Sequence, residues 1–176
     1  MDIALDQAND ETNIIEACVR KEKWAQRIVY ETYYAEMLSV CMRYSKDESQ
    51  AEDILHEAFI KVFRYIHRYK PNTALNAWIK RIVVNSSIDQ YRKNVRRRHV
   101  DLDNTYNLES GDVDPHSTCT EKDILKCIQS LSDRYRAVFN LYVLDGFSHR
   151  EVAKKLNISE STSRSNLAKA RARLRD

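Results

Sequence analysis

Cationic and hydroxyl side chains recur in the segment from residue 146 to residue 174, GFSHREVAKKLNISESTSRSNLAKARARL. If its second half is helical, one face presents Arg164, Ser165, Lys169, Arg171 and Arg173. Guanidinium and ammonium groups donate hydrogen bonds to phosphate oxygens and base edges, and small residues allow a close approach. This composition is what a helix needs to enter the major groove of DNA.

Such a face needs a helix, a tight turn and a second helix to position it. Ser148 and Glu151 form a capping box that predicts the start of the first helix, and Asn157 tolerates the left-handed conformation that ends it. Ser159 or Ser161 can cap the second helix. The inward residues are expected to be Val152, Ala153, Leu156, Ile158, Leu167, Ala170 and Leu174.

The charge balance helps to separate DNA binding from an ordinary solvated surface. Two amphipathic helices joined by a turn occur in many all-helical proteins, so the helix pair alone leaves both interpretations open. Residues 147–176 carry eight Lys or Arg against three acids. A local excess of this kind favours a phosphate-rich partner.

A second cationic segment lies earlier in the chain. Residues 64–99 contain ten Lys or Arg and one acid, Asp89, and four aromatic residues interleave with the charges: Tyr65, Tyr69, Trp78 and Tyr91. Cations that hold the backbone and rings that stack on bases are typical of proteins that bind single-stranded or melting nucleic acid. The alternative is that the tyrosines cover a helix junction; Trp78 we predict to be core. The run Arg96–Arg98 is interpreted as phosphate contacts.

The clearest helical pattern covers residues 51–66. Its apolar positions are 54, 55, 58, 59, 62, 63 and 66, a spacing typical of a helix with one buried face. The opposite face holds Glu52, Asp53, His56, Glu57 and Lys61. Acids near a helix start suit its dipole, and an exposed acidic helix is equally a docking surface for a basic partner. His56 alone is interpreted as a surface residue.

Composition predicts the fold class. Two Gly and two Pro in 176 residues are too few for a chain rich in strands and turns, so we predict an all-α protein. Further helices are expected at 13–21, 24–44 and 74–96, the last capped by Asn72 or Thr73. After residue 120, one helix is expected to carry Ile124, Leu125, Ile128 and Leu131. Another, capped by Ser132, is expected to end at Gly146 with Tyr135, Val138, Phe139, Tyr142 and Val143 inward. Residues 1–12 are expected to be frayed.

A segment without helical periodicity divides the chain. Residues 100–120 contain five acids and no Lys or Arg, which predicts a flexible linker. The segment is either an ordinary tether or an acidic strap that threads a positively charged channel of a partner. The predicted domains are therefore residues 1–99 and 121–176, two small helical domains joined by this linker.

Several other classes of protein are disfavoured. No Gly-rich phosphate loop, metal-spaced His/Cys cluster or nucleophile elbow is present, so we predict no enzyme, no cofactor and no metal. Cys18, Cys41, Cys119 and Cys127 form no Cys-x-x-Cys pair and are predicted to be reduced thiols. No apolar run is long enough for a membrane span, and the acidic N-terminus lacks a signal segment, so a cytoplasmic protein is expected.

The order of these motifs resembles the extracytoplasmic-function (ECF) RNA polymerase sigma factors of the sigma-70 family. AEDILHEAFIKVF resembles the region that binds the polymerase clamp helices, and AWIKRIVVNSSIDQYRK resembles the helix that reads the −10 element. The segment from residue 131 to residue 174 resembles the region that reads the −35 element, and the likeness covers residues 14–174. It implies a non-catalytic factor whose partners are core RNA polymerase and promoter DNA, duplex at −35 and melted at −10. An anti-sigma factor is a further implied partner, which the linker would accommodate.

The resemblance also implies roles for particular residues. For core polymerase binding, it implies Glu52, Asp53, His56, Glu57 and Phe59, with Phe59 contributing mainly to the core. For the −10 element, it implies Tyr69, Asn72, Thr73, Asn85, Arg92, Lys93 and Arg96. For the −35 element, it implies Arg150, Arg164, Ser165, Ala168, Lys169 and Arg171.

The chain departs from the family pattern in the second helix of residues 146–174, the recognition helix that is expected to enter the major groove. Ser163 stands where the family usually has an aliphatic residue, so weaker packing of this helix is expected. Asn166 and Ala168 are smaller or less basic than is common, which leaves the preferred −35 sequence open. The alternative function is a stand-alone helix-turn-helix regulator without polymerase contacts, which would leave the acidic face of residues 51–66 without a role.

Overall fold

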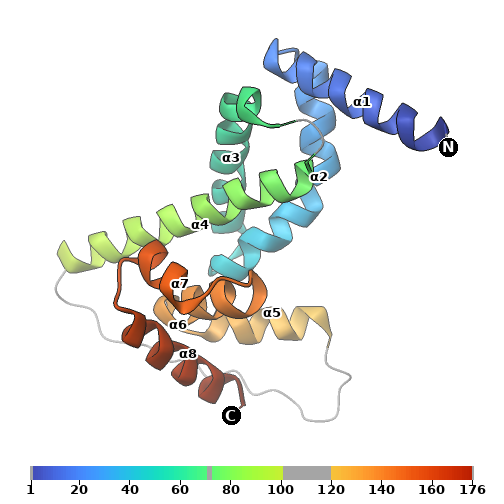
Figure 1. The fold of residues 1–176 in the computed structure, drawn as a ribbon. Helices are drawn as coiled ribbons and strands as arrows, with labels where there is room; N and C mark the ends of the chain where they lie inside the picture. The colour runs from blue at the N-terminus through green and yellow to red at the C-terminus, as the bar shows by residue number, and fades with distance from the viewer. Residues whose placement is uncertain (1, 71–72, 101–119, 176) are drawn as a thin grey trace. The chain divides into compact units, whose positions relative to one another are not determined.

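The computed structural model describes residues 2–70, 73–100 and 120–175, and in these ranges every regular element is helical (Figure 1). The all-α prediction is confirmed. The α-helices are α1 (Asp2–Val19), α2 (Lys23–Tyr44), α3 (Glu48–Tyr65), α4 (Leu75–Val100), α5 (Glu121–Ser130), α6 (Asp133–Phe139), α7 (His149–Leu156) and α8 (Glu160–Arg175). A 3-10 turn, η1 (Ile66–Arg68), and a π-helix, η2 (Asn140–Leu144), complete the list. Asn72 and residues 101–119, which include Cys119 and most of the linker predicted at 100–120, lie outside the described residues.

The helices pack into two compact units. The first comprises Met1–Cys41 and Ser49–Ser86, and the second comprises Met42–Glu48 and Ser87–Asp176. None of the helices in the described ranges is both long and apolar enough to cross a membrane.

The apolar stripe of α3 supplies the centre of the first unit. As the spacing predicts, Leu55, Phe59 and Val62 are buried, and the Phe59 ring meets the ring of Tyr30 edge-on at 4.8 Å between centroids. Other buried apolar side chains come from α1, α2 and α4 and include Cys18, Val29, Met37, Ile79 and Val83. Packing of this kind stabilises the unit by removing apolar area from water.

The N-terminal prediction is wrong in one respect. Residues 1–12 were expected to be frayed, whereas α1 begins at Asp2. No Gly or Pro interrupts residues 2–19, so no backbone penalty stops the helix from extending toward the N-terminus.

The approach to α4 also differs from the prediction. Helix α4 begins at Leu75, and the hydroxyl of Thr73 donates to the carbonyl oxygen of Lys70 at 2.8 Å instead of capping the helix. Trp78, predicted to be core, is half-buried, and its ring lies 5.8 Å from that of Tyr69.

In the second unit, a π-helix changes which residues face inward. Val143 was expected to be buried after α6, but it is 41% exposed, whereas Asn140 and Leu141 are fully buried. A wider turn rotates the residues that follow relative to ordinary helical spacing, so the predicted inward pattern fails at Val143. Ser132 occupies the N-cap of α6 as predicted but makes no side-chain capping bond.

Polar side chains in and beside the π-helix bond within their own unit, while Oδ1 of Asn140 is buried without a hydrogen-bond partner. Asn140 donates from Nδ2 to the carbonyl oxygen of Arg43 at 2.6 Å. The hydroxyl of Tyr44 donates to the carboxylate of Asp145, and the Arg43 guanidinium lies 3.7 Å from the same carboxylate. Burial of Tyr44, followed by the nearby carboxylate, raises the pKa of its hydroxyl well above the ordinary value.

The predicted reduced thiols agree with the structure where it describes them. Cys18 and Cys41 are buried and Cys127 is half-buried, and none of these three is in a disulfide. Burial, assisted by the nearby Glu22, raises the pKa of the Cys18 thiol to about 11. A protonated thiol is the less reactive form, in keeping with a packing role.

The helix-turn-helix forms as predicted from its local signals. Ser148 and Glu151 make the reciprocal capping box, and Asn157 ends α7 in the left-handed conformation at φ 55°. Ser159 accepts from the Thr162 amide at 3.0 Å and so provides the predicted cap of α8. Ile158, expected to be buried in the turn, is half-buried. Helix α8 packs against both α6 and α7 (Figure 1).

Candidate nucleic-acid interface

Helix α8 presents a continuous exposed face that combines cations with small residues. All the residues assigned to −35 DNA on this helix are exposed: Arg164, Ser165, Ala168, Lys169 and Arg171. Arg150, assigned from the preceding helix α7, is also exposed. Arg164 pairs with Glu160 at 2.5 Å. Exposed ion pairs of this kind are weak, so a phosphate can replace the carboxylate.

The buried side of α8 holds this face in position. Leu167 and Ala170 are buried as predicted, and Leu174 is half-buried. Ser163 is 0% exposed, and its Oγ lies 2.9 Å from Nδ1 of His149 at the start of α7. Sequence reasoning missed the role of His149. The available signal was a serine at an inward position of α8, which requires a polar partner.

The electrostatic surroundings of His149 favour its neutral form. Burial is the largest cause that lowers its pKa, and the positive charge of Arg164 is the next. Glu160 acts in the opposite sense and Arg171 lowers the pKa further. A neutral imidazole keeps one ring nitrogen free to accept a hydrogen bond, which a charged imidazolium lacks.

The segment assigned to the −10 element is held by Tyr69. Its ring is buried, and its hydroxyl donates to the carbonyl oxygen of Thr73 and lies 3.2 Å from the carboxylate of Glu11. The pKa of this hydroxyl is raised, and burial is the largest cause. The Thr73 side chain is exposed. The Tyr69 hydroxyl is therefore bonded to the backbone of Thr73 while its ring is turned into the protein.

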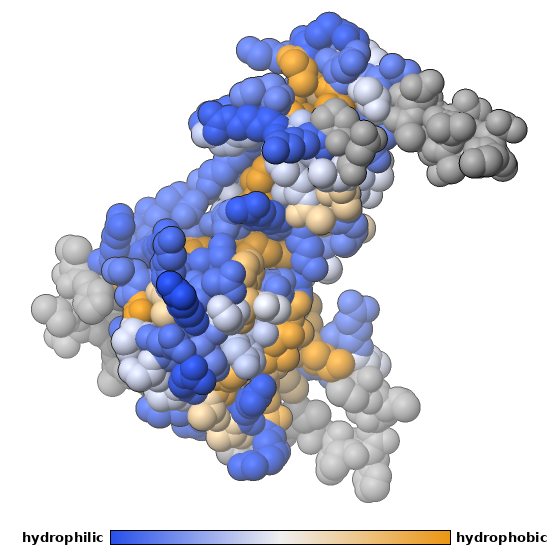
Figure 2. Space-filling model, in the orientation of Figure 1, coloured by the Kyte–Doolittle hydropathy of each residue, from blue (hydrophilic) through white to orange (hydrophobic). Residues whose placement is uncertain are grey.

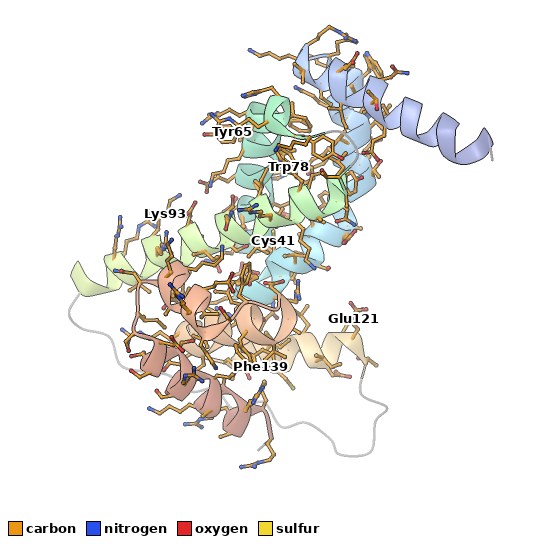
Figure 3. The ribbon with its side chains drawn as sticks, viewed as in Figure 1. Cys41, Tyr65, Trp78, Lys93, Glu121 and Phe139 are labelled. Atoms are coloured by element: carbon orange, nitrogen blue, oxygen red, sulfur yellow. The ribbon has the colours of Figure 1, made fainter. Side chains whose placement is uncertain are left out.

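The other residues assigned to the −10 element lie along α4. Asn85, Lys93 and Arg96 are exposed and Arg92 is half-buried. An ion pair 3.9 Å long joins Arg92 to Asp89. Residues 85, 89, 92 and 96 follow the three-to-four spacing of one helical face. Figure 3 shows Trp78 and Lys93 on this helix, with Trp78 near its start. The side chain of Arg98 lies outside the described residues.

The exposed face of α3 has a different chemistry. Asp53 and His56 are exposed, Glu52 and Glu57 are half-buried, and Lys61 lies 3.7 Å from Glu57. Phe59, which the resemblance placed at this surface but mainly as a core residue, is 3% exposed and belongs to the core.

An isoleucine that sequence reasoning did not single out lies among these acids. Ile60 is 60% exposed, and positions 53, 56, 57, 60 and 64 share one side of the helix. On the face drawn in Figure 2, hydrophilic residues predominate and hydrophobic patches lie between them. An exposed isoleucine ringed by charged residues is a composition typical of a protein-docking surface.

The part of the chain that the structure describes contains no group of three or more His, Cys, Asp or Glu side chains placed to hold a metal ion.

Comparison with protein families places both segments in one class. The family described as "Sigma-70 region 2" matches residues 29–97, and "Sigma-70, region 4" matches residues 121–174. The first match contains α3 and most of α4, and the second contains the helix-turn-helix. The fold and the two matches define a protein of the sigma-70 class that carries regions 2 and 4.

Individual relatives show which group within the sigma-70 class the chain is similar to. The chain is 32% identical over 139 residues to the ECF RNA polymerase sigma factor SigE of Mycolicibacterium smegmatis, with 76% of this chain and 54% of that protein covered. It is 30% identical over 149 residues to the ECF sigma factor SigM of Bacillus subtilis, with 84% and 91% covered. With the ECF sigma-E factor of Escherichia coli K12 it shares 26% identity over 170 residues, covering 90% and 88%.

A solved structure shares the fold. The sigma factor RpoE of Bartonella quintana, solved in complex with the anti-sigma factor NepR, superposes with a TM-score of 0.51 at 21% identity, covering 85% of this chain and 93% of that one. The chain belongs to the ECF RNA polymerase sigma factor family, whose members bind RNA polymerase and direct promoter-specific initiation. It spans about half the length of the M. smegmatis relative and nine-tenths of the B. subtilis one.

Proposed function

We propose that this chain binds core RNA polymerase through α3 and directs it to promoters that carry a −35 and a −10 element. The observation that carries the proposal is the exposed cationic face of α8, built on a complete helix-turn-helix within the region 4 match. Core polymerase supplies the catalysis, and the chain itself needs no cofactor. The predicted domain boundaries at residues 99 and 121 are kept as part of this proposal.

Region 4 reads duplex DNA. Helix α8 enters the major groove, where Arg164, Ser165 and Lys169 reach base edges and phosphates, and Ala168 leaves room for close approach. Arg150 and Arg171 contact the flanking backbone. Because these contacts release counterions, affinity for the −35 duplex falls steeply as salt rises.

Region 2 captures a base of the melted −10 element. Asn72, Thr73 and Asn85 hold the base, while Arg92, Lys93 and Arg96 contact the backbone of the same strand. Tyr69 positions the backbone of this segment through its bond to Thr73. Because a flipped base is available only in the melted state, binding it shifts the promoter toward that state.

The acidic face of α3 docks core polymerase. Glu52, Asp53, His56 and Glu57 meet a basic surface, and Ile60 lies among them as the apolar contact. Complementary charge speeds encounter and rejects wrong partners, and a buried apolar side chain slows dissociation. Phe59 supports this face from the core.

Regulation follows the family pattern. We propose an anti-sigma factor as a further partner, a proposal supported by the complex in which the Bartonella quintana neighbour was solved. We also propose that the chain acts in the cytoplasm, where RNA polymerase and the chromosome lie.

Reconstituted transcription tests the function directly. Purified chain is added to core polymerase with a library of promoter fragments, and transcripts are mapped. We expect initiation at a set of sites that share −35 and −10 sequences and that core polymerase alone does not use. Specific DNA binding without polymerase binding would instead indicate a stand-alone regulator, and the absence of any specific transcript would contradict the proposal.

A further inference from the structure

A buried serine connects the two helices of the DNA-binding motif. Ser163 is 0% exposed on the inward side of α8, and its Oγ lies 2.9 Å from Nδ1 of His149. His149 follows the N-cap serine directly, so its position in the first turn of α7 is set by the capping box. One hydrogen bond thus spans from a firmly capped helix start to the recognition helix.

The imidazole is itself held from a third element. The His149 ring stacks on Tyr142 of η2 with 4.2 Å between centroids and 22° between planes. Helix α7 packs against η2 as well as against α8. Tyr142, His149 and Ser163 therefore form a row that runs from η2 through α7 into α8.

The hydrogen bond is directional in a way that an apolar contact at the same place is not. An aliphatic side chain packs well over a range of small rotations, whereas a hydroxyl–imidazole bond weakens steeply when its angle changes. A buried hydroxyl that loses its partner also loses stabilisation that water can no longer supply. The pair therefore favours one rotation of α8 about its axis.

That rotation decides where the candidate DNA contacts point. Arg164 and Ser165 follow Ser163 directly in α8, and Arg150 follows His149 directly in α7. Each half of the pair is adjacent in sequence to a residue assigned to −35 DNA. The bond therefore sets the position of Arg150 relative to that of Arg164 and Ser165.

We propose that His149 is a positioning residue for −35 recognition, which holds α8 through Ser163 in the rotation that the cognate base pairs require. The inference rests on the proposed function and assigns to His149 a role that involves no contact with DNA. It also explains how a serine serves where weaker packing of the helix was expected.

The lowered pKa of His149 supports this geometry. Around neutral pH the ring is neutral, and in the tautomer with hydrogen on Nε2 the Ser163 hydroxyl donates to Nδ1. The charged groups that act on the ring come from α8: Arg164 and Arg171, which disfavour its protonation, and Glu160, which favours it.

The test compares cognate and shuffled DNA. Wild-type chain with core polymerase first enriches promoters from a random library. Dissociation constants of the holoenzyme are then measured for an enriched promoter and for the same DNA with its −35 base pairs shuffled. The variants are Ser163→Ala, His149→Leu, both together, and His149→Asn, whose amide oxygen can replace Nδ1 as acceptor. Ser130→Ala, the same change at an exposed position of α5, is the matched control.

The expected readout is the ratio of the two dissociation constants. Each of the first two variants should lower cognate discrimination by roughly three- to tenfold, the range expected when one hydrogen bond of ordinary strength is lost. The double variant should be no worse than the poorer single variant, because both remove the same bond. His149→Asn should restore discrimination to within about twofold of wild type, and Ser130→Ala should leave it unchanged.

The ratio separates positioning from damage to the fold. A partly unfolded chain binds both DNAs less in equal proportion, so its ratio stays constant, and circular dichroism records the folded fraction. If His149→Leu does not fold, Ser163→Ala, which removes a single oxygen atom, carries the test. Unchanged discrimination in folded Ser163→Ala overturns the positioning role while the proposed function stands. Failure of wild type to enrich any promoter overturns the proposed function and, with it, the positioning role.

Discussion

Helices α3 and α8 are both amphipathic, yet they are held by different means. The inward side of α3 is a run of large apolar side chains, with Leu55, Phe59 and Val62 all buried. The inward side of α8 is sparse by comparison and includes the hydrogen-bonded Ser163.

The outer faces of the two helices also differ. Helix α3 presents acids around an exposed isoleucine, which suits a protein surface, whereas α8 presents cations and small residues, which suit DNA. We infer that partner choice lies in the outer face and precision of placement in the inner one.

The largest expected effect comes from reversing the charge of α3. Asp53→Lys with Glu57→Lys should weaken core polymerase binding by roughly 100-fold, because like charges across an interface cost several kcal/mol. Co-elution and fluorescence anisotropy with core polymerase measure this. If DNA binding falls equally, the outer faces of α3 and α8 are not specialised for different partners.

The matching change on α8 should affect only DNA. Lys169→Ala with Arg171→Ala should weaken binding to −35 duplex by roughly tenfold at low salt and reduce the slope of log affinity against log salt by about 2. Polymerase affinity should stay at the wild-type level. Lys122→Ala, which removes an exposed cation of α5, is the control. An equal loss of DNA affinity in this variant would mean that binding depends on overall positive charge and not on α8.

Removing the exposed isoleucine of α3 tests whether the acids act alone. Ile60→Ser should weaken polymerase binding by about fivefold, since an apolar side chain buried at an interface contributes about 1–3 kcal/mol. Stability should not change, because the side chain is 60% exposed. Ile124→Ser, also an exposed isoleucine but on α5, should bind polymerase normally. If Ile60→Ser binds polymerase as tightly as the wild-type chain, the charged residues alone account for docking.

The neighbouring residue should behave in the opposite way. Phe59→Leu should lower the free energy of unfolding by about 1–2 kcal/mol, because a buried ring 4.8 Å from that of Tyr30 is replaced by a smaller side chain. Polymerase affinity of the folded fraction should change less than twofold. Thermal melting and binding below the transition measure the two quantities, and a stable variant that binds poorly would place Phe59 on the docking surface.

The smallest expected effect is a pH dependence that arises in the recognition motif. The pKa of His149 is lowered in the folded chain, so the unfolded chain binds its proton more readily. Stability from this group is complete above the unfolded pKa, near 6.5, and declines as pH falls below it. Denaturant titrations of the wild-type chain should therefore give a lower free energy of unfolding at pH 5.5 than at pH 7.5. This difference should be smaller in His149→Leu. An identical pH dependence in the variant contradicts this assignment.

The helix-turn-helix could be predicted almost completely from the sequence. Its capping box, left-handed Asn157 and inward Leu167 and Ala170 all appear in the structure. The same holds for the buried stripe of α3. These signals act between residues within one or two helical turns, so they can be recognised without knowing the path of the chain.

The failures share a different physical origin. Val143 was expected to be buried, and the π-helix turned it outward. Trp78 was predicted to be core, and it is half-buried. Spacing rules assume a uniform helix and cannot anticipate a wider turn, and an aromatic residue in a basic segment packs into a core or stacks on a base with equal chemical sense.

The helices and their ends could therefore be predicted from the sequence, because caps, charge and apolar spacing act over a few neighbouring residues. The partners of buried polar groups could not. Ser163 meets His149 across 14 residues, and Asn140 meets the backbone of Arg43 across 97. Only the folded chain brings such groups together, because the free energy that selects them comes from burial in a particular three-dimensional neighbourhood.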